Sequence, residues 1–593
     1  MVRTFFGLAV SIAIVVGVPV HASAQSADGT WKLSYLTAGN DLVAAIVKMQ
    51  TKDGKATGEL VAGSPRLKGL ELVSVNQDGK LLRITLKTPA IEVAFEANVP
   101  ANPGKRIGGV LSVGDSLFPA ELNQTADSEL DLKNSLKAID CPPLQQAKTL
   151  TAKANSLRLQ AQLSKDAEKK KDLLKQAVEA EAVAKKETPK LYREVIEKHA
   201  DSPGVFDASL ALIKAAKPGE TKVEEIKAWA DAGANVAKSY GPRWQGEYAY
   251  QVANLLVTQD AYAKAALDYA RQAEKALPEK ASANDESRVL NLVVRALKKN
   301  DMAADAKAYE ARFAKIEEKL DAEYSAKMPG FKGTAFEGRK GKSDRAVFME
   351  LFTGATCPPC VAADLAFDVL QKSYKPSELV LIQYHVHIPG PDPMTNPGTV
   401  DRWKYYTGAF PKDVRGVPSS LFNGKPQGGG GGGAAAAENK YNAYRTIIDP
   451  LLEDPSTAKI KAAATRKGDK VEINVSADVA APGEEKKLRL LLTEETVRYP
   501  GSNKIRLHHN VVRAFPNGVN GTALTEASTK FTSTVDISEL RAGLNKYLDD
   551  YQLNVRPFLN PARPLEMSHL RVVAYVQDDA THEILQAIQV EVK

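Results

Sequence analysis

The sequence predicts a multidomain protein of mixed fold class, in which two β-rich regions enclose a helical region and an α/β domain. The length of 593 residues exceeds what one hydrophobic core supports, and favours about four domains. Apolar and polar residues alternate near both ends, and helical spacing prevails between them, which sets the order of these domains. With 44% apolar and 25% charged residues, the composition is that of a folded chain.

The net charge is too small to indicate a nucleic-acid partner. A formal charge of +7 is spread over the whole length, and no stripe of Lys and Arg alternates with aromatic residues. We therefore expect no nucleic acid among the partners.

Residues 1–24 have the pattern of a secretory signal peptide. Arg3 supplies a positive start, residues 5–20 are apolar, and Ala22-Ser23-Ala24 fits the cleavage rule, so the mature chain is expected to begin at Gln25. An uncleaved membrane anchor is the alternative. No later stretch has the apolar length of a membrane span. We expect an exported protein, in the periplasm or cell envelope or secreted, with no membrane span in the mature chain.

Residues 25–125 are predicted to form a small β-barrel or β-sandwich domain with antiparallel strands. Asp53-Gly54 and Asp78-Gly79 each lie between strand-like runs, which is a strong hairpin signal. The region holds no Cys or His and no acid cluster with ligand spacing, so we interpret it as a binding or spacer module.

Residues 126–325 are predicted to form an α-helical domain, because Ala, Lys, Glu and Leu recur there at helical spacing. Residues 191–203 and 248–278 loosely resemble the helix-and-turn units of tetratricopeptide-type (TPR) repeats. Such a domain provides either a concave surface for a protein partner or a structural arm. Cys141, near its start, is interpreted as a small apolar residue, with pairing to another protein or a resolving role as the alternatives.

The remaining residues are predicted to form a linker at 326–344, an α/β domain with a central sheet at 345–455, and a C-terminal β-sandwich at 456–593. Within the last region, Gly468-Asp469 predicts a hairpin turn. The elements expected in the α/β domain are strands at 346–351, 379–384 and 416–422, helices at 361–370, around 402–406 and at 439–452, a Pro-rich loop at 388–396 and a flexible Gly run at 428–433.

Cys357 and Cys360 are the candidate catalytic residues, in the run Phe-Thr-Gly-Ala-Thr-Cys-Pro-Pro-Cys at 352–360. The preceding strand and the following helix place both cysteines at a helix N-terminus, where unpaired N–H groups and the helix dipole stabilise a thiolate. Two intervening residues let the sulfurs meet within one helical turn. This pattern predicts Cys357 as the exposed nucleophile and Cys360 as its resolving partner.

Other functions of a Cys-x-x-Cys pair fit the sequence less well. A structural zinc site needs two more ligands, and no second Cys pair or His pair at zinc spacing lies nearby. A c-type haem needs His after the second Cys, where Val361 stands. We therefore predict no metal and no cofactor beyond a redox-active Cys357–Cys360 disulfide. A plain structural disulfide is the alternative that stays open.

The motif strand, the Cys-Pro-Pro-Cys helix and the later step Val417-Pro418 resemble the thioredoxin superfamily. The exported, multidomain setting resembles its periplasmic TlpA-like thiol–disulfide oxidoreductases, and the Phe-Thr-Gly approach resembles thioredoxin-like outer-membrane proteins. The resemblance implies a cis proline at Pro418 against the sulfurs, with substrate bound by the backbone beside Val417. It also implies protein thiol or disulfide substrates and an upstream redox partner.

The sequence departs from that family at two positions. Thr356 stands where the family usually has Trp, and Leu351 stands where members often bury a proton-transferring acid. Glu350 is one residue out of register, so strand alternation should turn it to the opposite face. The remaining candidates for proton transfer or an auxiliary role are Asp364, one helical turn after Cys360, and His385 and His387, which end the second strand.

Two function classes remain open. The first is an exported thiol–disulfide oxidoreductase, and the second is a non-catalytic envelope interaction protein whose thioredoxin-like domain only binds. His508 and His509 do not change this choice, because neighbouring strand residues point to opposite faces and rarely share one metal ion.

Overall fold

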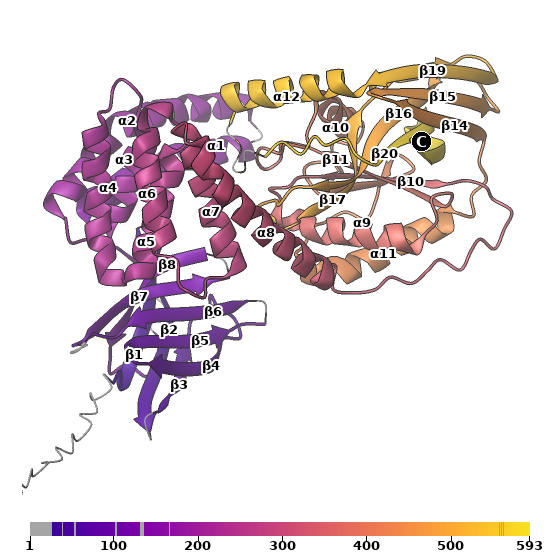
Figure 1. Ribbon diagram of the computed structural model, residues 1–593. Coiled ribbons are helices and arrows are strands. Elements are labelled where there is room, and N and C mark those ends of the chain that lie inside the picture. The colour runs from indigo at the N-terminus through magenta and orange to yellow at the C-terminus, as the bar shows by residue number, and fades with distance from the viewer. Residues whose placement is uncertain are drawn as a thin grey trace, which may run out of the picture. The chain divides into compact units, whose positions relative to one another are not determined.

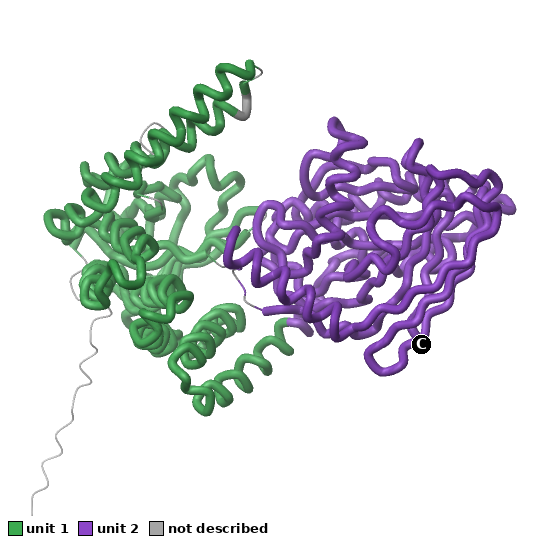
Figure 2. The backbone as a smooth tube through the Cα atoms, turned by 90° about the horizontal axis from the view of Figure 1, so that it is seen from above, with its two compact units in different colours: residues 1–320 green, residues 321–593 purple. Residues whose placement is uncertain are grey.

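The computed structural model describes residues 26–37, 39–52, 55–89, 91–100, 104–114, 116–130, 136–164, 166–556, 558, 560 and 562–593. The predicted signal peptide, the expected start at Gln25 and the predicted turn at Asp53-Gly54 lie outside these residues. The chain divides into two compact units, Met1–Leu320 and Asp321–Lys593 (Figure 2).

The first unit begins with an antiparallel, barrel-like sheet, which confirms the N-terminal β prediction. Its strand order is β3-β2-β1-β8-β7-β6-β5-β4, with β9 paired to β2. A Cβ atom added at Gly58 of β3 would lie 2.5 Å from Val75 of β4, so the two ends of this order are side by side. Asp78 pairs with Leu81 across the predicted hairpin turn, where Gly79 has a φ of +56°. The strands are β1 (Gly29–Thr37), β2 (Asn40–Lys52), β3 (Lys55–Gly63), β4 (Glu71–Asp78), β5 (Leu81–Lys87), β6 (Glu92–Asn98), β7 (Arg106–Val113), β8 (Ser116–Gln124) and β9 (Leu136–Ala138).

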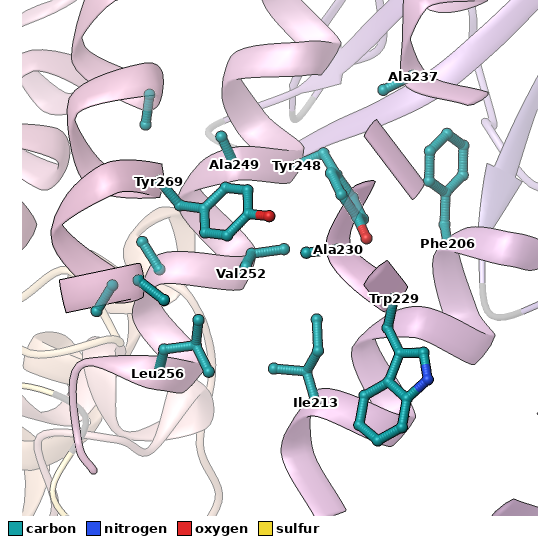
Figure 3. Packing of buried hydrophobic residues seen from close by; sticks show 14 of the residues in the cluster. Phe206, Ile213, Trp229, Ala230, Ala237, Tyr248, Ala249, Val252, Leu256 and Tyr269 are labelled. Carbon is teal, nitrogen blue, oxygen red and sulfur yellow. The ribbon is translucent and has the colours of Figure 1, made fainter. Parts of the chain in front are cut away.

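The helices that follow confirm a helical region, which begins at Pro142 rather than at residue 126. Their shared core contains aromatic side chains such as Phe206 and Tyr248, whose ring centroids lie 5.6 Å apart (Figure 3). Cys141 is buried in this core with a free thiol, as the apolar interpretation predicted. The helices are α1 (Pro142–Leu163), α2 (Ala167–Lys198), α3 (Gly204–Ala215), α4 (Val223–Ala237), α5 (Pro242–Leu256), α6 (Ala263–Lys275), α7 (Ala283–Lys299) and α8 (Ala303–Lys327), with short 3-10 turns η1 (Lys238–Tyr240) and η2 (Asp260–Tyr262).

The second unit is organised around a mixed sheet with the order β13-β12-β10-β11-β17-β16-β20-β21 (Figure 1). Strands β10 and β11 are parallel, and β12 is antiparallel to β10. Helices and strands alternate in the predicted order through α11. The elements are β10 (Val347–Thr353), η3 (Pro358–Cys360), α9 (Val361–Ser373), β11 (Leu379–His385), α10 (Pro397–Ala409), β12 (Ser419–Phe422), β13 (Lys425–Pro426), η4 (Ala434–Ala436), α11 (Ala437–Leu451), β14 (Ala458–Lys467), β15 (Lys470–Val479), β16 (Gly483–Arg498), β17 (Leu507–Ala514), β18 (Thr522–Leu524), β19 (Ser528–Asp536), α12 (Ile537–Asn554), β20 (Leu570–Asp578) and β21 (Glu583–Glu591).

The C-terminal strands differ from the expected separate sandwich because they continue the sheet of the α/β region. Strand β17 joins β11 through the pair Gln383 and Val511. A second sheet, β14-β15-β19, packs on the C-terminal part of the long sheet around Val471, Leu490 and Val572. The predicted turn at Gly468-Asp469 joins β14 to β15. Every residue of β11 is buried, so its second edge needs a partner strand, and period-two alternation does not identify that partner.

The two faces of the long sheet around β10 carry different helices. Val347, Met349 and Leu351 face α9 and α11, which lie side by side in Figure 1. Phe348 and Phe352 face the opposite side, with Tyr406 of α10. This alternation follows from strand geometry and decides which polar side chains of β10 can meet the helix that follows the cysteines.

The predicted linker at 326–344 is built into the second unit. Helix α8 continues to Lys327, and Phe331 and Phe336 then pack on the α9–α11 side of the sheet. The backbone N–H of Phe336 donates to the carbonyl of Ser373 at 2.8 Å. In the described part of the chain, no helix combines the length and the apolar character that crossing a membrane requires.

Candidate functional site

Cys357 and Cys360 form a disulfide at the junction of β10 and α9. Cys357 precedes the turn η3, and Cys360 is the residue before the first residue of α9. Pro358 and Pro359 occupy the first positions of the turn, where a missing N–H costs least. The strand, turn and helix are those that the sequence predicted around the motif.

The expectation that Cys357 is exposed was wrong. Its residue is 1% exposed and Cys360 is fully buried. The chain before Cys357 is held from two sides, because Ala355 N–H donates to Asp392 and Ala355 O accepts from the backbone N–H of Asn503. The short turn therefore keeps both sulfurs close to the protein interior, while Pro358 and Pro359 face solvent.

Val417 and Pro418 lie beside the disulfide, as the family resemblance implies. The Val417-Pro418 peptide bond is cis, and the carbonyl oxygen of Val417 is 3.7 Å from the Sγ atom of Cys357. The structure thus brings together two segments that are about sixty residues apart in the sequence.

The Gly run 428–433 also contacts the disulfide turn, which its low-complexity sequence did not predict. Gly432 N–H donates to Pro359 O at 2.7 Å, and Ala362 N–H donates to Gly432 O at 2.9 Å. A Cβ atom at Gly431 would lie 2.5 Å from Pro359 O, so this approach requires glycine. The segment is therefore held against the turn between the cysteines rather than forming a flexible loop.

Asp364 lies one helical turn after Cys360 and is buried. Thr353 Oγ1 donates to its Oδ2 atom at 3.0 Å, and Gln383 Nε2 approaches its Oδ1 atom at 3.4 Å. Burial raises the pKa of Asp364 to about 7, although His385 and Thr353 act in the lowering direction. A carboxyl group with such a pKa can take up and release a proton near neutral pH.

Asp368, one further turn along α9, was not among the predicted site residues. Burial and the neighbouring Asp364 raise its pKa well above the usual range. His509 Nε2 lies 3.7 Å from Asp368 Oδ1. The acid spacing Asp364-x-x-x-Asp368 was visible in the sequence, but the burial of Asp364 and the partial burial of Asp368 were not.

His385 pairs with a second acid that sequence reasoning missed, Asp392 in the Pro-rich loop. The His385 Nδ1 and Asp392 Oδ2 atoms are 2.8 Å apart, and both side chains are fully buried. Burial acts to raise the pKa of Asp392, but His385 and the N–H groups of Ala355 and Met394 lower it to about 2. This carboxylate therefore ties a strand-end histidine to the backbone that leads into Cys357. An acid seven residues after that histidine was the available sequence signal.

Two other histidines contact the His385–Asp392 pair. His508 packs edge-on against His385, with ring centroids 4.9 Å apart, and burial lowers its pKa to about 3. His387 accepts a hydrogen bond from Asp392 N–H and stacks on Tyr551 of α12 at 3.7 Å. Burial lowers the pKa of His387 to about 4, so its ring is neutral at pH 7. The two ring nitrogens of His387 are thus engaged by Asp392 N–H and by the Tyr547 hydroxyl.

Glu350 faces away from α9, as strand alternation predicted. Its Oε1 atom accepts from Arg402 Nη2 at 2.9 Å, and its Oε2 atom accepts from the Tyr406 hydroxyl. The pair of Glu350 and Arg402 is almost completely buried, with side-chain exposures of 0% and 1%. Glu350 therefore stabilises the α10 face of the sheet and is not positioned toward the helix that carries Cys360.

The arrangement allows redox chemistry at two sulfurs, and a titratable carboxyl group, that of Asp364, follows Cys360 by one helical turn. Among the described residues, no group of three or more His, Cys, Asp or Glu side chains is placed to hold a metal ion. Val417 and Gly432 contact the disulfide turn, and Asp392, which pairs with His385, holds the chain before Cys357 through Ala355.

Comparisons with known proteins add little to this geometry. No protein-family model matches the chain, and the search of curated proteins found no match. Among solved structures, HBP35 of Porphyromonas gingivalis aligns at 16% identity and a TM-score of 0.29, covering 43% of this chain and 77% of that chain. Protein AGR_C_4864 from Agrobacterium tumefaciens aligns at 15% identity and a TM-score of 0.27, covering 42% of this chain and 96% of that chain. Similarities at this level carry no argument about fold or function.

Proposed function

We propose that the chain is an exported thiol–disulfide oxidoreductase of the thioredoxin-like class, which exchanges disulfides with protein substrates. The observation that carries the proposal is the Cys357–Cys360 disulfide at the start of α9, with the Val417 carbonyl 3.7 Å from one sulfur. The alternating strands and helices from β10 to α11 around one sheet support the thioredoxin-like assignment.

The proposed reaction transfers two electrons. The Cys357 thiolate attacks one sulfur of a substrate disulfide, which forms a mixed disulfide and releases one substrate thiolate. The Cys360 thiolate then attacks Cys357 Sγ, which closes the Cys357–Cys360 disulfide and releases the second substrate thiolate. The substrate is reduced and the enzyme is oxidised. In reverse, the enzyme disulfide oxidises a substrate dithiol.

Asp364 is the proposed proton acceptor for Cys360 during the second step. The Cys360 thiol must lose its proton before it attacks, and it is buried away from water. Asp364 follows one turn later on the same helix, with a pKa raised by burial to about 7. It would replace the acid that is absent at Leu351, with Thr353 and Gln383 as positioning residues.

The other regions would bring this site to its substrates. The helices of residues 142–327 are proposed to form a TPR-like surface for a protein partner, and the N-terminal barrel a spacer or binding module. The signal-like pattern of residues 1–24 supports export to the periplasm or cell envelope, where disulfides persist. An upstream redox partner would reset the dithiol.

The test is a disulfide-reduction assay with the purified full-length mature chain and dithiothreitol as the terminal reductant. Cys357→Ser should abolish turnover. After reduction and removal of the dithiothreitol, Cys360→Ser should accumulate a mixed disulfide between Cys357 and the substrate, visible as a mass increase that added reductant reverses. Equal turnover in both variants and the wild type would contradict the proposal.

A second candidate is a non-catalytic interaction protein with a structural Cys357–Cys360 disulfide. The 1% exposure of Cys357 favours it, because a nucleophile must reach its substrate. Alkylation after mild reduction distinguishes the two functions. A thiolate stabilised at the helix N-terminus reacts at mildly acidic pH, whereas a structural disulfide resists reduction and does not react.

A further inference from the structure

The first unit contains a pocket of about 210 Å³ at the junction of the N-terminal barrel and the helices. Most of its lining residues belong to strands β1 and β8 and to helices α3 and α5. An apolar cavity of roughly 150 Å³ is large enough to bind benzene. The pocket therefore has room for one ring with a short substituent.

The lining of this pocket is mainly apolar, and its aromatic rings are held by other side chains. Phe206 packs edge-on against Trp244, with ring centroids 5.5 Å apart. Phe118 packs against Tyr35, with ring centroids 5.4 Å apart. An apolar lining with a few polar groups is typical of small-molecule sites, and favours a ligand with a hydrophobic ring.

Trp244 provides an unused hydrogen-bond donor in the lining. The residue is only 4% exposed, and its Nε1 atom finds no acceptor among the described residues. Trp31, the other almost completely buried tryptophan of this unit, donates from Nε1 to the carbonyl of Ala27 at 2.9 Å. An indole N–H can only donate, and a buried donor without an acceptor costs about 1–3 kcal/mol. A ligand that brings an acceptor removes this cost.

Asp207 provides an unused acceptor in the same lining. Its Oδ2 atom is buried and accepts no hydrogen bond within the described part of the chain. The ammonium group of Lys148 lies 3.6 Å from this oxygen, beyond hydrogen-bond distance. Burial raises the pKa of Asp207, although Lys148 acts in the lowering direction. A carboxylate that is incompletely compensated in this way favours a cationic donor on the ligand.

We propose that this pocket binds a small aromatic amine with one ring. The ring occupies the apolar lining, a hydroxyl on the ring accepts from Trp244 N–H, and the ammonium group donates to Asp207. The site lies in the first unit, whereas Cys357 and Cys360 lie in the second, so the proposal does not depend on the proposed redox function.

The first experiment measures calorimetric binding of three phenols to the full-length mature protein. Tyramine carries the ammonium group, 4-ethylphenol is neutral, and 4-hydroxyphenylacetate is an anion. Tyramine should bind with a Kd of about 1 mM or tighter, 4-ethylphenol about tenfold more weakly, and the anion most weakly. No heat of binding with tyramine, equal affinities for the three phenols, or tightest binding of the anion would overturn the proposal.

Asp207→Asn tests the contact with the ammonium group. The variant should weaken tyramine binding about tenfold and leave 4-ethylphenol binding within about twofold of wild type. Equal changes for the two ligands would refute the role of Asp207.

Trp244→Phe tests the contact with the hydroxyl, because it keeps a ring and removes the N–H donor. Tyramine binding should weaken about fivefold or more, whereas binding of phenethylamine, which lacks the hydroxyl, should stay within about twofold of wild type. Trp229→Phe is the matched control, since Trp229 is buried in the same helical core but does not line the pocket. It should change neither affinity. Equal losses for both amines in Trp244→Phe, or the same loss of tyramine affinity in the control, would refute the role of Trp244.

Discussion

The two faces of the sheet around β10 each bury a carboxyl group, but the two carboxyl groups have different hydrogen-bond partners. On the α10 face, Glu350 has a cation, because Arg402 donates to it twice and Tyr406 adds a hydroxyl. On the α9 face, the donors within hydrogen-bond distance of Asp364 among the described residues are the neutral side chains of Thr353 and Gln383. Glu350 is paired with the positive charge of Arg402, whereas burial raises the pKa of Asp364 to about 7.

This difference shows that the partner, rather than burial alone, decides what a buried acid does. A carboxylate paired with an arginine is held ionised and contributes to packing. A carboxyl group that lacks such a cation stays close to its titration point and can exchange a proton with a neighbouring thiol. Both acids are buried next to β10, but only Asp364 lies on the helix that carries Cys360.

The largest loss of stability is expected when the Glu350–Arg402 ion pair is broken. Arg402→Met leaves Glu350 buried without a cation and should lower stability by about 3–5 kcal/mol. The free energy of opening of the β10 amides, measured by hydrogen exchange, reports this loss. The double variant Glu350→Gln/Arg402→Met should recover part of it. A loss below about 1 kcal/mol in the single variant would show that the ion pair is not what holds this face.

Asp364→Asn should raise stability above neutral pH, in contrast to the loss expected for Arg402→Met. The folded chain keeps the Asp364 proton up to about pH 7, whereas the unfolded chain releases it near the usual value of 3.8. The wild type therefore loses stability as pH rises through this window, by on the order of a few kcal/mol. The variant should lack this loss, so its advantage should grow from pH 4 to pH 8. Urea unfolding at the two pH values checks the sign.

The same Asp364→Asn change should slow resolution of the mixed disulfide by about a hundredfold at pH 7, because Cys360 loses its proton acceptor. Stopped-flow measurement on pre-formed mixed disulfide isolates this step. The deficit should shrink at high pH, where hydroxide removes the thiol proton. A deficit that does not depend on pH would indicate a structural role instead.

Asp392→Asn should cause an intermediate loss of stability. The variant loses an ionised acceptor for His385 and Ala355 N–H, which costs about 1–3 kcal/mol at pH 7. Because the folded pKa of Asp392 is lowered to about 2, the wild-type advantage should be present above pH 4 and disappear as pH falls through 2. Acid-unfolding curves of the two proteins should therefore converge at low pH.

Thr353→Val is expected to have the smallest effect. It removes the hydroxyl donor to Asp364 while keeping the shape, so stability should fall by about 0.5–1.5 kcal/mol. Since this hydrogen bond lowers the pKa of Asp364, its loss should move the pH midpoint of mixed-disulfide resolution upward. A downward shift would show that Asp364 does not control that midpoint.

Much of this geometry follows from local sequence patterns. Period-two alternation placed Glu350 on the face opposite α9, and the helical period placed Asp364 one turn after Cys360. The hairpin turns at Gly79 and Gly468 follow from turn chemistry, and both glycines have positive φ.

Features that depend on long-range contacts could not be predicted. The position of Asp392 depends on the path of a Pro-rich loop, which has no periodicity. The burial of Cys357 depends on two remote segments that close over the turn. The joining of β11 to β17 depends on a choice of partner strand, and alternation fits many partners equally well.

The long sheet of the second unit also makes one of its inner strands depend on a partner far along the chain. Strand β11 ends at His385, beside the disulfide, but its outer neighbour β17 is complete only when the chain has reached Ala514. Until then, the mostly apolar strand β11 has an open edge, which is prone to pair with other chains. A fragment that stops at residue 455 would keep that edge permanently, so the sheet that supports Cys357, Cys360 and Asp364 is completed only by the last part of the chain.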